Sequence, residues 1–256
     1  RPSRGSSTGT PEAPRASAAL RGGAGAATLR PMTDAPDPAA PPPASDAERV
    51  AARFTRSDGS FLFARWGRRP APVVFGTDEA GSEIFGAALR DAAGVAGLET
   101  AAEDPELGAN CMVFFCSEWP ELKGVPHLDR LIPDLGRLVS VLSGAGANQY
   151  RIFGFDEAGA IRLCLVLLRY DEHLASVSAR TLALGQAVQS LLLWSDEAFT
   201  DGSPIARLPE GGGTIVEPWH AALLRAAYDP VLPARAEDPS FALRLAARMG
   251  ETGARG

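Results

Sequence analysis

Apolar side chains recur three to four positions apart in several stretches of the chain, the spacing that places them on one face of a helix. Ser45, followed three positions later by Glu48, resembles a capping box, which predicts that the first helix begins at Asp46. Pro218 suits the first turn of a later helix, where its missing N–H is not needed. The segments predicted as helices are 46–54, 78–94, 127–142, 174–194, 218–228 and 239–249.

Shorter apolar runs between turn residues predict the strands. The run 110–116 is apolar after its first residue, which indicates burial on both faces of a sheet. The sequence Asp156-Glu157-Ala158-Gly159 separates two further runs and predicts an antiparallel hairpin. The predicted strands are 73–76, 110–116, 150–156 and 160–170. This order of elements is typical of an α/β or α+β protein with helices packed on a mixed sheet.

The first 45 residues differ from the rest in composition. Ala, Pro, Gly, Ser and Thr dominate there, and the only larger apolar residues are Leu20, Leu29 and Met32. So little apolar surface cannot offset the entropy lost on ordering. We therefore expect residues 1–45 to be disordered and residues 46–256 to form a single globular domain. Met32 begins a Met-Thr-Asp-Ala-Pro run that resembles a translation start, so the true start lies at Met32 or upstream.

Charge is distributed unevenly along the chain, which has a formal net charge of −6, with 45% hydrophobic and 22% charged residues. Residues 1–45 hold five arginines and three acidic residues, a balance of +2, which leaves −8 for residues 46–256. An acidic body argues against a nucleic-acid partner, because such binding uses clustered cations. No run approaches the ~18–20 uninterrupted apolar residues of a membrane-spanning helix. No signal peptide is visible, so we expect a cytoplasmic protein; an export signal at the true N-terminus would instead indicate the periplasm or envelope.

The three cysteines do not have the spacing of metal ligands. Cys111 and Cys116 are five positions apart in one predicted strand, so they point to opposite faces and cannot share a metal. Together with Cys164 they are predicted to be buried, reduced thiols. The chain contains neither a Gly-x-Ser-x-Gly elbow nor a Gly-x-x-x-x-Gly-Lys phosphate loop. We therefore predict no metal site, no cofactor and no assigned catalytic residue.

The helix predicted after the hairpin carries the candidate site. A long helix in this position, followed by a polar loop, resembles the active-site helix of zinc-dependent peptidases, whose His-Glu-x-x-His motif binds the metal. Gly185, Gln186 and Gln189 stand at the motif positions, and none of them can serve as a zinc-bound imidazole or as a base. This predicts a zincin-like core with a long central helix whose hydrolytic chemistry has been lost. In the alternative interpretation, Gln186 and Gln189 are hydrogen-bonded polar groups that pack the helix against the hairpin.

A family resemblance rests on short motifs in matching order. They are Arg65-Trp66, Asn110, Gln189-Ser190-Leu191-Leu192-Leu193, Asp196, Ser203 and Ala227-Tyr228-Asp229-Pro230. Across about residues 60–235 the chain resembles a bacterial family labelled domain of unknown function 2927. Members are described as lipoproteins or envelope proteins, and no activity is established for them, so the resemblance implies a location but no reaction. The chain departs from the family at Gly185-Gln186 and at Leu192.

These observations favour a noncatalytic, degenerate zincin-like domain that binds or scaffolds a peptide or protein in a cleft between the hairpin and the long helix. An exposed edge strand accepts an extended peptide by backbone pairing and needs no metal. Tyr150, Trp194 and Trp219 are candidate aromatic contacts. The residues predicted to line the cleft are Gln186, Gln189, Trp194, Asp196, Ser203 and Tyr228. The sequence identifies neither the ligand nor the oligomeric state.

The alternative function is a residual hydrolase of the peptidase kind that uses the acidic cluster after the long helix. It requires Asp196, Glu197 or Asp201 to lie within hydrogen-bond distance of His173 or His220. The competing interpretation of the acidic cluster is a solvated loop whose side chains stabilise turns. Metal analysis of the purified protein distinguishes the two functions.

Overall fold

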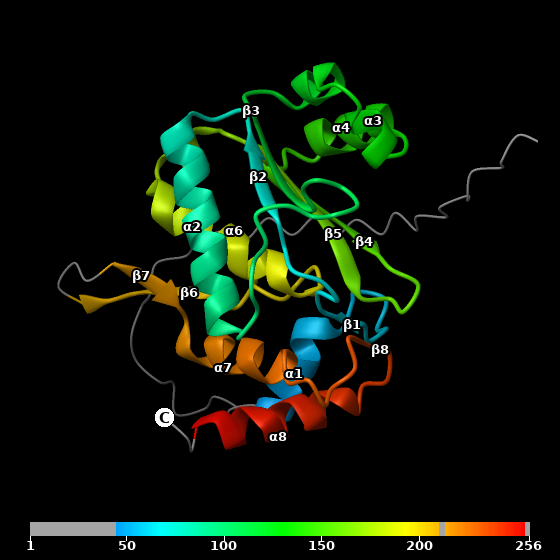
Figure 1. The fold of residues 1–256 in the computed structure, drawn as a ribbon, viewed down its shortest axis with the longest axis vertical. Coiled ribbons are helices and arrows are strands. Elements are labelled where there is room, and N and C mark those ends of the chain that lie inside the picture. The colour runs from blue at the N-terminus through cyan, green and yellow to red at the C-terminus, as the bar shows by residue number, and fades with distance from the viewer. Residues whose placement is uncertain (1–44, 210–212, 254–256) are drawn as a thin grey trace, which may run out of the picture.

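The computed structural model describes residues 45–209 and 213–253, with side chains as far as residue 250. Its centre is a four-stranded sheet in which β3 and β5 lie between β2 and β4 (Figure 1). β2, β3 and β5 are parallel, whereas β4 is antiparallel to β5. The strands are β2 (Pro72–Phe75), β3 (Cys111–Cys116), β4 (Gln149–Phe155) and β5 (Ile161–Arg169). This mixed sheet with helices packed on it confirms the predicted α+β class.

Successive side chains of the inner strands point to opposite faces of the sheet, and each face has its own layer of helices. α2 (Glu79–Val95) and α6 (Ala179–Leu191) cover the face that carries Cys111 and Val166. η1 (Trp119–Gly124), α3 (Leu128–Leu131) and α4 (Leu135–Gly144) cover the face that carries Phe114 and Leu167. The sheet is therefore buried on both sides, as the apolar run 110–116 predicted.

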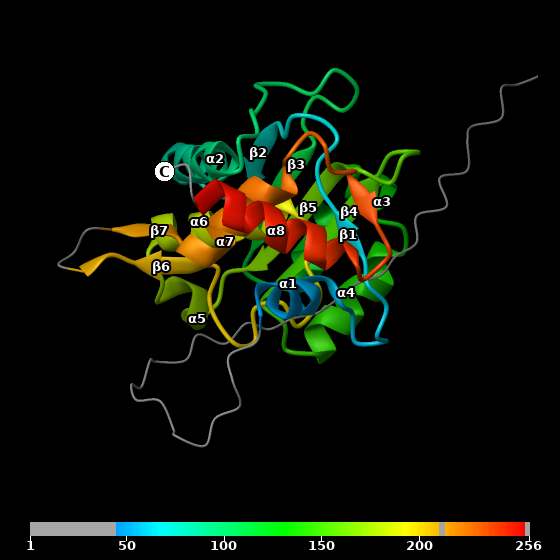
Figure 2. The same cartoon turned by 90° about the horizontal axis from the view of Figure 1, so that it is seen from below.

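A third group of elements packs at one end of the sheet (Figures 1 and 2). It contains α1 (Asp46–Phe54), α7 (Pro218–Ala227) and α8 (Phe241–Gly253), in which α8 contacts both other helices. A short ribbon of β1 (Phe63–Ala64) and β8 (Arg235–Ala236) lies beside them. The two ends of the described chain therefore meet in one layer.

Two predicted features are confirmed in detail. The Ser45 hydroxyl accepts a hydrogen bond from the Glu48 amide, and the Glu48 carboxylate accepts one from the Ser45 amide at 2.8 Å, so the capping box begins α1. The hairpin of β4 and β5 turns through residues 156–160, where Gly159 adopts a φ of +77° that suits a glycine.

The predicted long helix after the hairpin is wrong. Two helices occupy this segment, α5 (Glu172–Ala175) and α6, because the Ser178 hydroxyl caps the amide of Thr181 and begins a new helix there. α6 ends at Leu191 because Leu192 and Leu193 are extended and pair with the segment around Ala64. α6 has 13 residues and α2 has 17, so α2 is the longer helix.

The single helix predicted over 127–142 is also wrong. Pro133 separates α3 from α4, and the residue before it, Ile132, is extended because the proline ring disfavours a helical conformation there. His127 and Asp134, which precede the two helices, have φ of 62° and 57°, in the left-handed region.

The polar loop predicted after the long helix contains a strand. β6 (Ile205–Arg207) pairs with β7 (Thr214–Val216) as a small antiparallel ribbon. Pro218 stands at the start of α7 as predicted. The predicted disorder of residues 1–45 concerns residues that, apart from Ser45, lie outside the described part of the chain.

Among the residues that the structure describes, no helix combines the length and the apolar character that crossing a membrane requires.

Candidate functional site

Four polar side chains join α6 to the edge strand β4. Arg151 donates from Nη2 to Gln186 Oε1 at 2.5 Å and from Nη1 to Gln189 Oε1 at 3.1 Å. Gln186 Nε2 donates to Gln149 Oε1 at 2.8 Å. Gln149 and Arg151 share a face of the strand, and Gln186 and Gln189 share a face of the helix. The contact confirms the interpretation that these glutamines pack the helix against the hairpin.

Arg151 is a cation in an unusual environment. Burial lowers its pKa, and the ionisable groups that act on it are the thiols of Cys164 and Cys111. Its Nε atom is buried and has no hydrogen-bond partner among the described residues. Among the described residues, the guanidinium of this half-buried arginine therefore has neutral amides and two thiols as its neighbours and no carboxylate within ion-pair distance.

The two thiols come from neighbouring strands. Cys111 of β3 and Cys164 of β5 are register partners, and their exposed fractions are 3% and 0%. Both point toward α2 and α6, whereas Cys116 points to the opposite face, as the odd spacing predicted. All three cysteines are free and buried.

Hydrogen bonds make the two thiols unequal. The hydrogen bond with Cys164, followed by burial, raises the pKa of the Cys111 thiol. Burial raises the pKa of the Cys164 thiol, but hydrogen bonds with Cys111 and Ser190 and the charge of Arg151 bring it below its ordinary value. By contrast, burial raises the pKa of Cys116 to about 11. Of the pair, Cys164 therefore carries the negative charge more readily.

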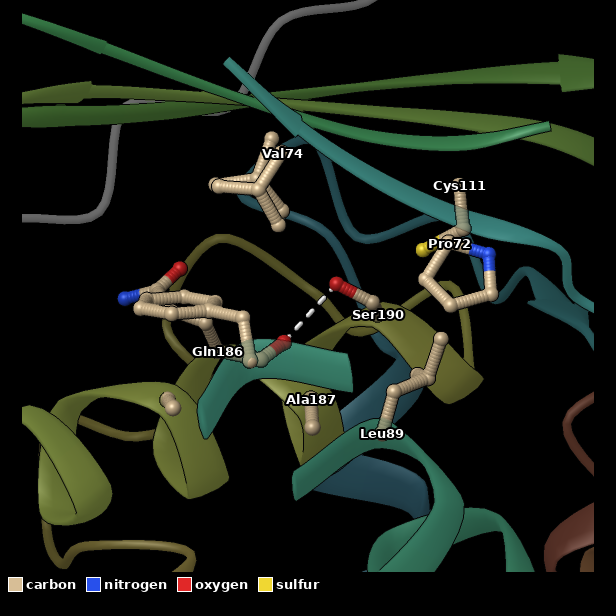
Figure 3. Close-up of a pocket in the computed structure, with 10 residues that line it drawn as sticks. Pro72, Val74, Leu89, Cys111, Gln186, Ala187 and Ser190 are labelled. Atoms are coloured by element: carbon tan, nitrogen blue, oxygen red, sulfur yellow. Dashed lines mark hydrogen bonds between the residues drawn. The ribbon is translucent and has the colours of Figure 1, made fainter. Parts of the chain in front are cut away.

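A pocket lies between the sheet and the two helices α2 and α6 (Figure 3). It contains about 300 Å³ of empty space, part of which is open to solvent. Cys111 points from the sheet toward α6, where the Ser190 hydroxyl donates to the Gln186 carbonyl at 2.8 Å (Figure 3). The pocket is lined by Pro72, Val74, Phe85, Leu89, Cys111, Val113, Ala183, Gln186, Ala187 and Ser190. Its wall is thus largely apolar, with a thiol, an amide and a hydroxyl as the polar groups.

The predicted cleft residues lie in several places. Gln186 and Gln189 meet at Arg151, and of the six only Gln186 lines the pocket of Figure 3. Trp194 stacks on Phe54 with 5.6 Å between the ring centroids. Its indole N–H donates to the Val188 carbonyl at 3.2 Å.

The other three predicted residues make separate local contacts. The Tyr228 hydroxyl donates to the Leu191 carbonyl, and burial raises its pKa. The Ser203 hydroxyl accepts from the amide of Ile205. Asp196 is half-buried and lies near enough to Tyr150 for its charge, after burial, to raise the tyrosine pKa.

The acidic cluster and the histidines pair with other groups. Asp201 binds Arg53 through two hydrogen bonds of 2.6 and 3.1 Å. His220 Nδ1 lies 2.8 Å from Glu217, a carboxylate outside the predicted cluster. His220 Nε2 is buried and has no hydrogen-bond partner among the described residues. His173 is exposed on α5.

Sequence reasoning missed Arg151 and the pairing of Cys111 with Cys164. A signal for Arg151 was present, because a single cation stands within an otherwise uncharged strand, 149–155. The thiol pair had no such signal, since the register between β3 and β5 depends on the folded sheet. Among the described residues, no group of three or more His, Cys, Asp or Glu side chains could hold a metal ion.

Comparisons with protein-family models, with curated proteins and with solved structures found no match to this chain. The resemblance to domain of unknown function 2927 and the kinship with zinc-dependent peptidases therefore stay predictions.

Proposed function

We propose that this chain is a noncatalytic binding module that holds an extended segment of a peptide or protein partner along the free edge of β4. The observation that carries the proposal is the position of β4 at the end of the strand order β2-β3-β5-β4. Among the described residues its single neighbour in the sheet is β5, so the opposite edge of β4 has no strand paired to it. An unpaired edge is the template that extended peptides use in β-augmentation.

The pairing of β4 with β5 identifies the groups that point outward. The Arg169 amide donates to the Asn148 carbonyl at 2.8 Å, which makes this pair a hydrogen-bonded one. Because bonded and nonbonded pairs alternate in an antiparallel ladder, Tyr150 and Ile152 also bond toward β5. The backbone groups of Gln149, Arg151 and Phe153 then point away from the sheet and are available to a partner.

The other edge strand of the sheet is less suitable. β2 has four residues and begins with Pro72, which lacks an amide donor. β4 has seven residues and contains no proline. It also contains one cation, Arg151, and no acidic residue, so a segment with β-branched residues and at least one carboxylate matches this edge in shape and charge.

Selection from a phage-displayed library of random octapeptides tests the proposal. Peptides selected on the full chain are expected to be rich in β-branched and acidic residues. They should lose at least about tenfold in affinity for Phe153→Pro, which removes one outward amide, and should still bind the matched control Phe153→Ala, which keeps that amide. Peptides that bind Phe153→Pro and Phe153→Ala equally well, or a selection without enrichment, would refute the proposal.

Amide hydrogen exchange with a selected peptide locates the binding. Exchange is expected to slow at Gln149, Arg151 and Phe153, whose amides gain a partner. The amides of Tyr150 and Ile152 already bond to β5 and should change little. A bound peptide that leaves the three outward amides at their original rates binds elsewhere, and the edge-strand proposal fails.

The alternative hydrolase draws on a different feature, the His220–Glu217 pair. A histidine held by a carboxylate is the base of many nucleophilic enzymes, and its second nitrogen must then reach a nucleophile. His220 Nε2 has no such group within hydrogen-bond distance among the described residues. Three aromatic side chains surround the ring instead: Trp194, Phe199 and Trp219. These contacts favour the binding module over the hydrolase.

A further inference from the structure

We infer that Cys111 and Cys164 form a modification site, at which a small hydroperoxide that enters the pocket between the sheet and α6 converts the two thiols into a reversible disulfide. This inference does not rest on the proposed function. It follows from the register of two strands, from the groups that surround the thiols and from the access that the pocket provides.

The strand geometry places the two sulfurs within bonding reach. Cys111 and Cys164 are direct partners in a parallel pair, and both side chains lie on the face that α2 and α6 cover. Neighbouring strands are about 4.8 Å apart, within the ~4.4–6.8 Å that a disulfide allows between Cα atoms. Cys116 is paired with Arg169 and points to the other face, so it cannot replace either partner.

The groups around the pair favour a thiolate. Arg151 provides a half-buried positive charge whose ionisable neighbours are these two thiols. Ser190 of α6 bonds to Cys164 and the two thiols bond to each other, so a proton can be shared between them. A thiolate is the form of cysteine that attacks a peroxide.

The pocket provides a path for a small oxidant to Cys111. Cys111 lines it, beside Ser190 and the apolar side chains of α2 and β2 (Figure 3). The pocket is partly open to solvent and admits a molecule only slightly larger than water, which hydrogen peroxide is. Cys111 therefore meets the oxidant, and Cys164 is the sulfur that resolves the product.

The chemistry balances with a hydroperoxide as the only oxidant. Cys164, the sulfur that loses its proton more readily, first releases that proton to solvent and then takes the proton of Cys111 through their hydrogen bond, so that the Cys111 thiolate attacks one oxygen of the peroxide. The O–O bond breaks, the leaving oxygen takes up a proton and departs as water or an alcohol, and Cys111 becomes a sulfenic acid. Cys164 then attacks the Cys111 sulfur, the S–O bond breaks and the hydroxyl leaves as water with the remaining proton. Two thiols are oxidised and one peroxide is reduced.

Thiol mapping on the full chain tests the inference. The protein is treated with millimolar hydrogen peroxide, unfolded, alkylated and digested, and the peptides are identified by mass spectrometry. The expected product is about 2 Da lighter and links Cys111 to Cys164. Cys116 stays available for alkylation, and dithiothreitol restores all three thiols. Cys111 and Cys164 that remain unlinked after the treatment, or a bridge that includes Cys116, would overturn the inference.

Two variants separate this site from general thiol oxidation. The control Cys116→Ser should form the Cys111–Cys164 bridge at a rate within about twofold of the unsubstituted chain, because Cys116 lies on the other face. Cys164→Ser lacks the resolving sulfur, so it should accumulate a sulfenic acid on Cys111, which dimedone added together with the denaturant traps once the chain unfolds. No dimedone adduct at Cys111 under these conditions would show that the oxidant does not react with this sulfur in the folded chain.

Discussion

The two faces of the sheet differ in how they are held to their helices. The face under α3 and α4 contacts them through apolar side chains, including Leu165 and Leu167, which are fully buried. The face under α2 and α6 also carries Arg151, which is hydrogen-bonded to two glutamines of α6, and two thiols that are hydrogen-bonded to each other. Apolar packing tolerates any side chain of the right volume, whereas a buried charge depends on particular partners. Stability at the α4 face should therefore depend mainly on side-chain volume, and at the α6 face also on which side chains are paired.

The largest effect is expected where the α4 face is truncated. Leu167→Ala removes a fully buried side chain and should lower the free energy of unfolding by about 2–5 kcal/mol. Leu167→Met conserves the volume and should lower it by less than about 1.5 kcal/mol. Urea unfolding measures both, and equal losses for the two variants would show that this face is not governed by volume.

On the α6 face, replacing both hydrogen-bonded partners should cost less stability than the two single replacements added together. Gln186→Leu takes an acceptor from the half-buried Arg151 guanidinium and should lower the free energy of unfolding by about 2–3 kcal/mol. The double variant with Arg151→Met removes the charge as well and should lose less than the sum of the single losses. Additive losses, measured by urea unfolding, would contradict the coupling of these two side chains.

Arg151 should also control the reactivity of the thiol pair. Arg151→Met removes the positive charge beside Cys164 and should slow the formation of the peroxide-induced disulfide by about tenfold. Arg151→Lys keeps a charge and should oxidise faster than the methionine variant. Timed quenching with an alkylating reagent gives the rates, and equal rates for all three chains would show that the charge has no role.

The smallest effect is expected at His220, a buried polar side chain that lies on neither face of the sheet. Burial lowers the pKa of His220 below its ordinary 6.5, so the unfolded chain binds this proton more readily than the folded one. Stability is therefore complete above the unfolded pKa and decreases as the pH falls below about 6.5, by at most about 1.4 kcal/mol per pH unit. His220→Phe should remove this decrease between pH 6.5 and the range near 4 in which carboxylates titrate. An unchanged pH profile of the denaturation midpoint would contradict it.

The sequence predicted the elements that local chemistry defines. The capping box at Ser45 and Glu48 and the turn before Gly159 act within a few residues, so both could be recognised from the chain alone. The errors came from breaks that a helical apolar pattern does not reveal. Ser178 begins a new helix and Pro133 interrupts another, although the apolar spacing continues across both.

The candidate site was predictable only in part. The position of Gln186 and Gln189 on one helix face follows from their spacing, and their contact with the hairpin was one of two interpretations. Their contact with Arg151 depends on the position of α6 relative to β4 in the folded protein. No local sequence pattern specifies that position. That Cys111 lies opposite Cys164 depends in the same way on the register of two strands that are distant in the sequence.

The end of α6 is held by side chains that come from far along the chain. Trp66 donates from its indole N–H to the Ser190 carbonyl at 2.8 Å, and the Tyr228 hydroxyl donates to the Leu191 carbonyl. These contacts fix the position, relative to the sheet, of the helix that carries Gln186 and Ser190. A shortened chain that stops before residue 228 would keep every residue of the pocket wall and the Trp66 contact, yet it would lose the Tyr228 hydrogen bond, so only one of these two contacts would still hold the end of the helix that closes the pocket beside Cys111.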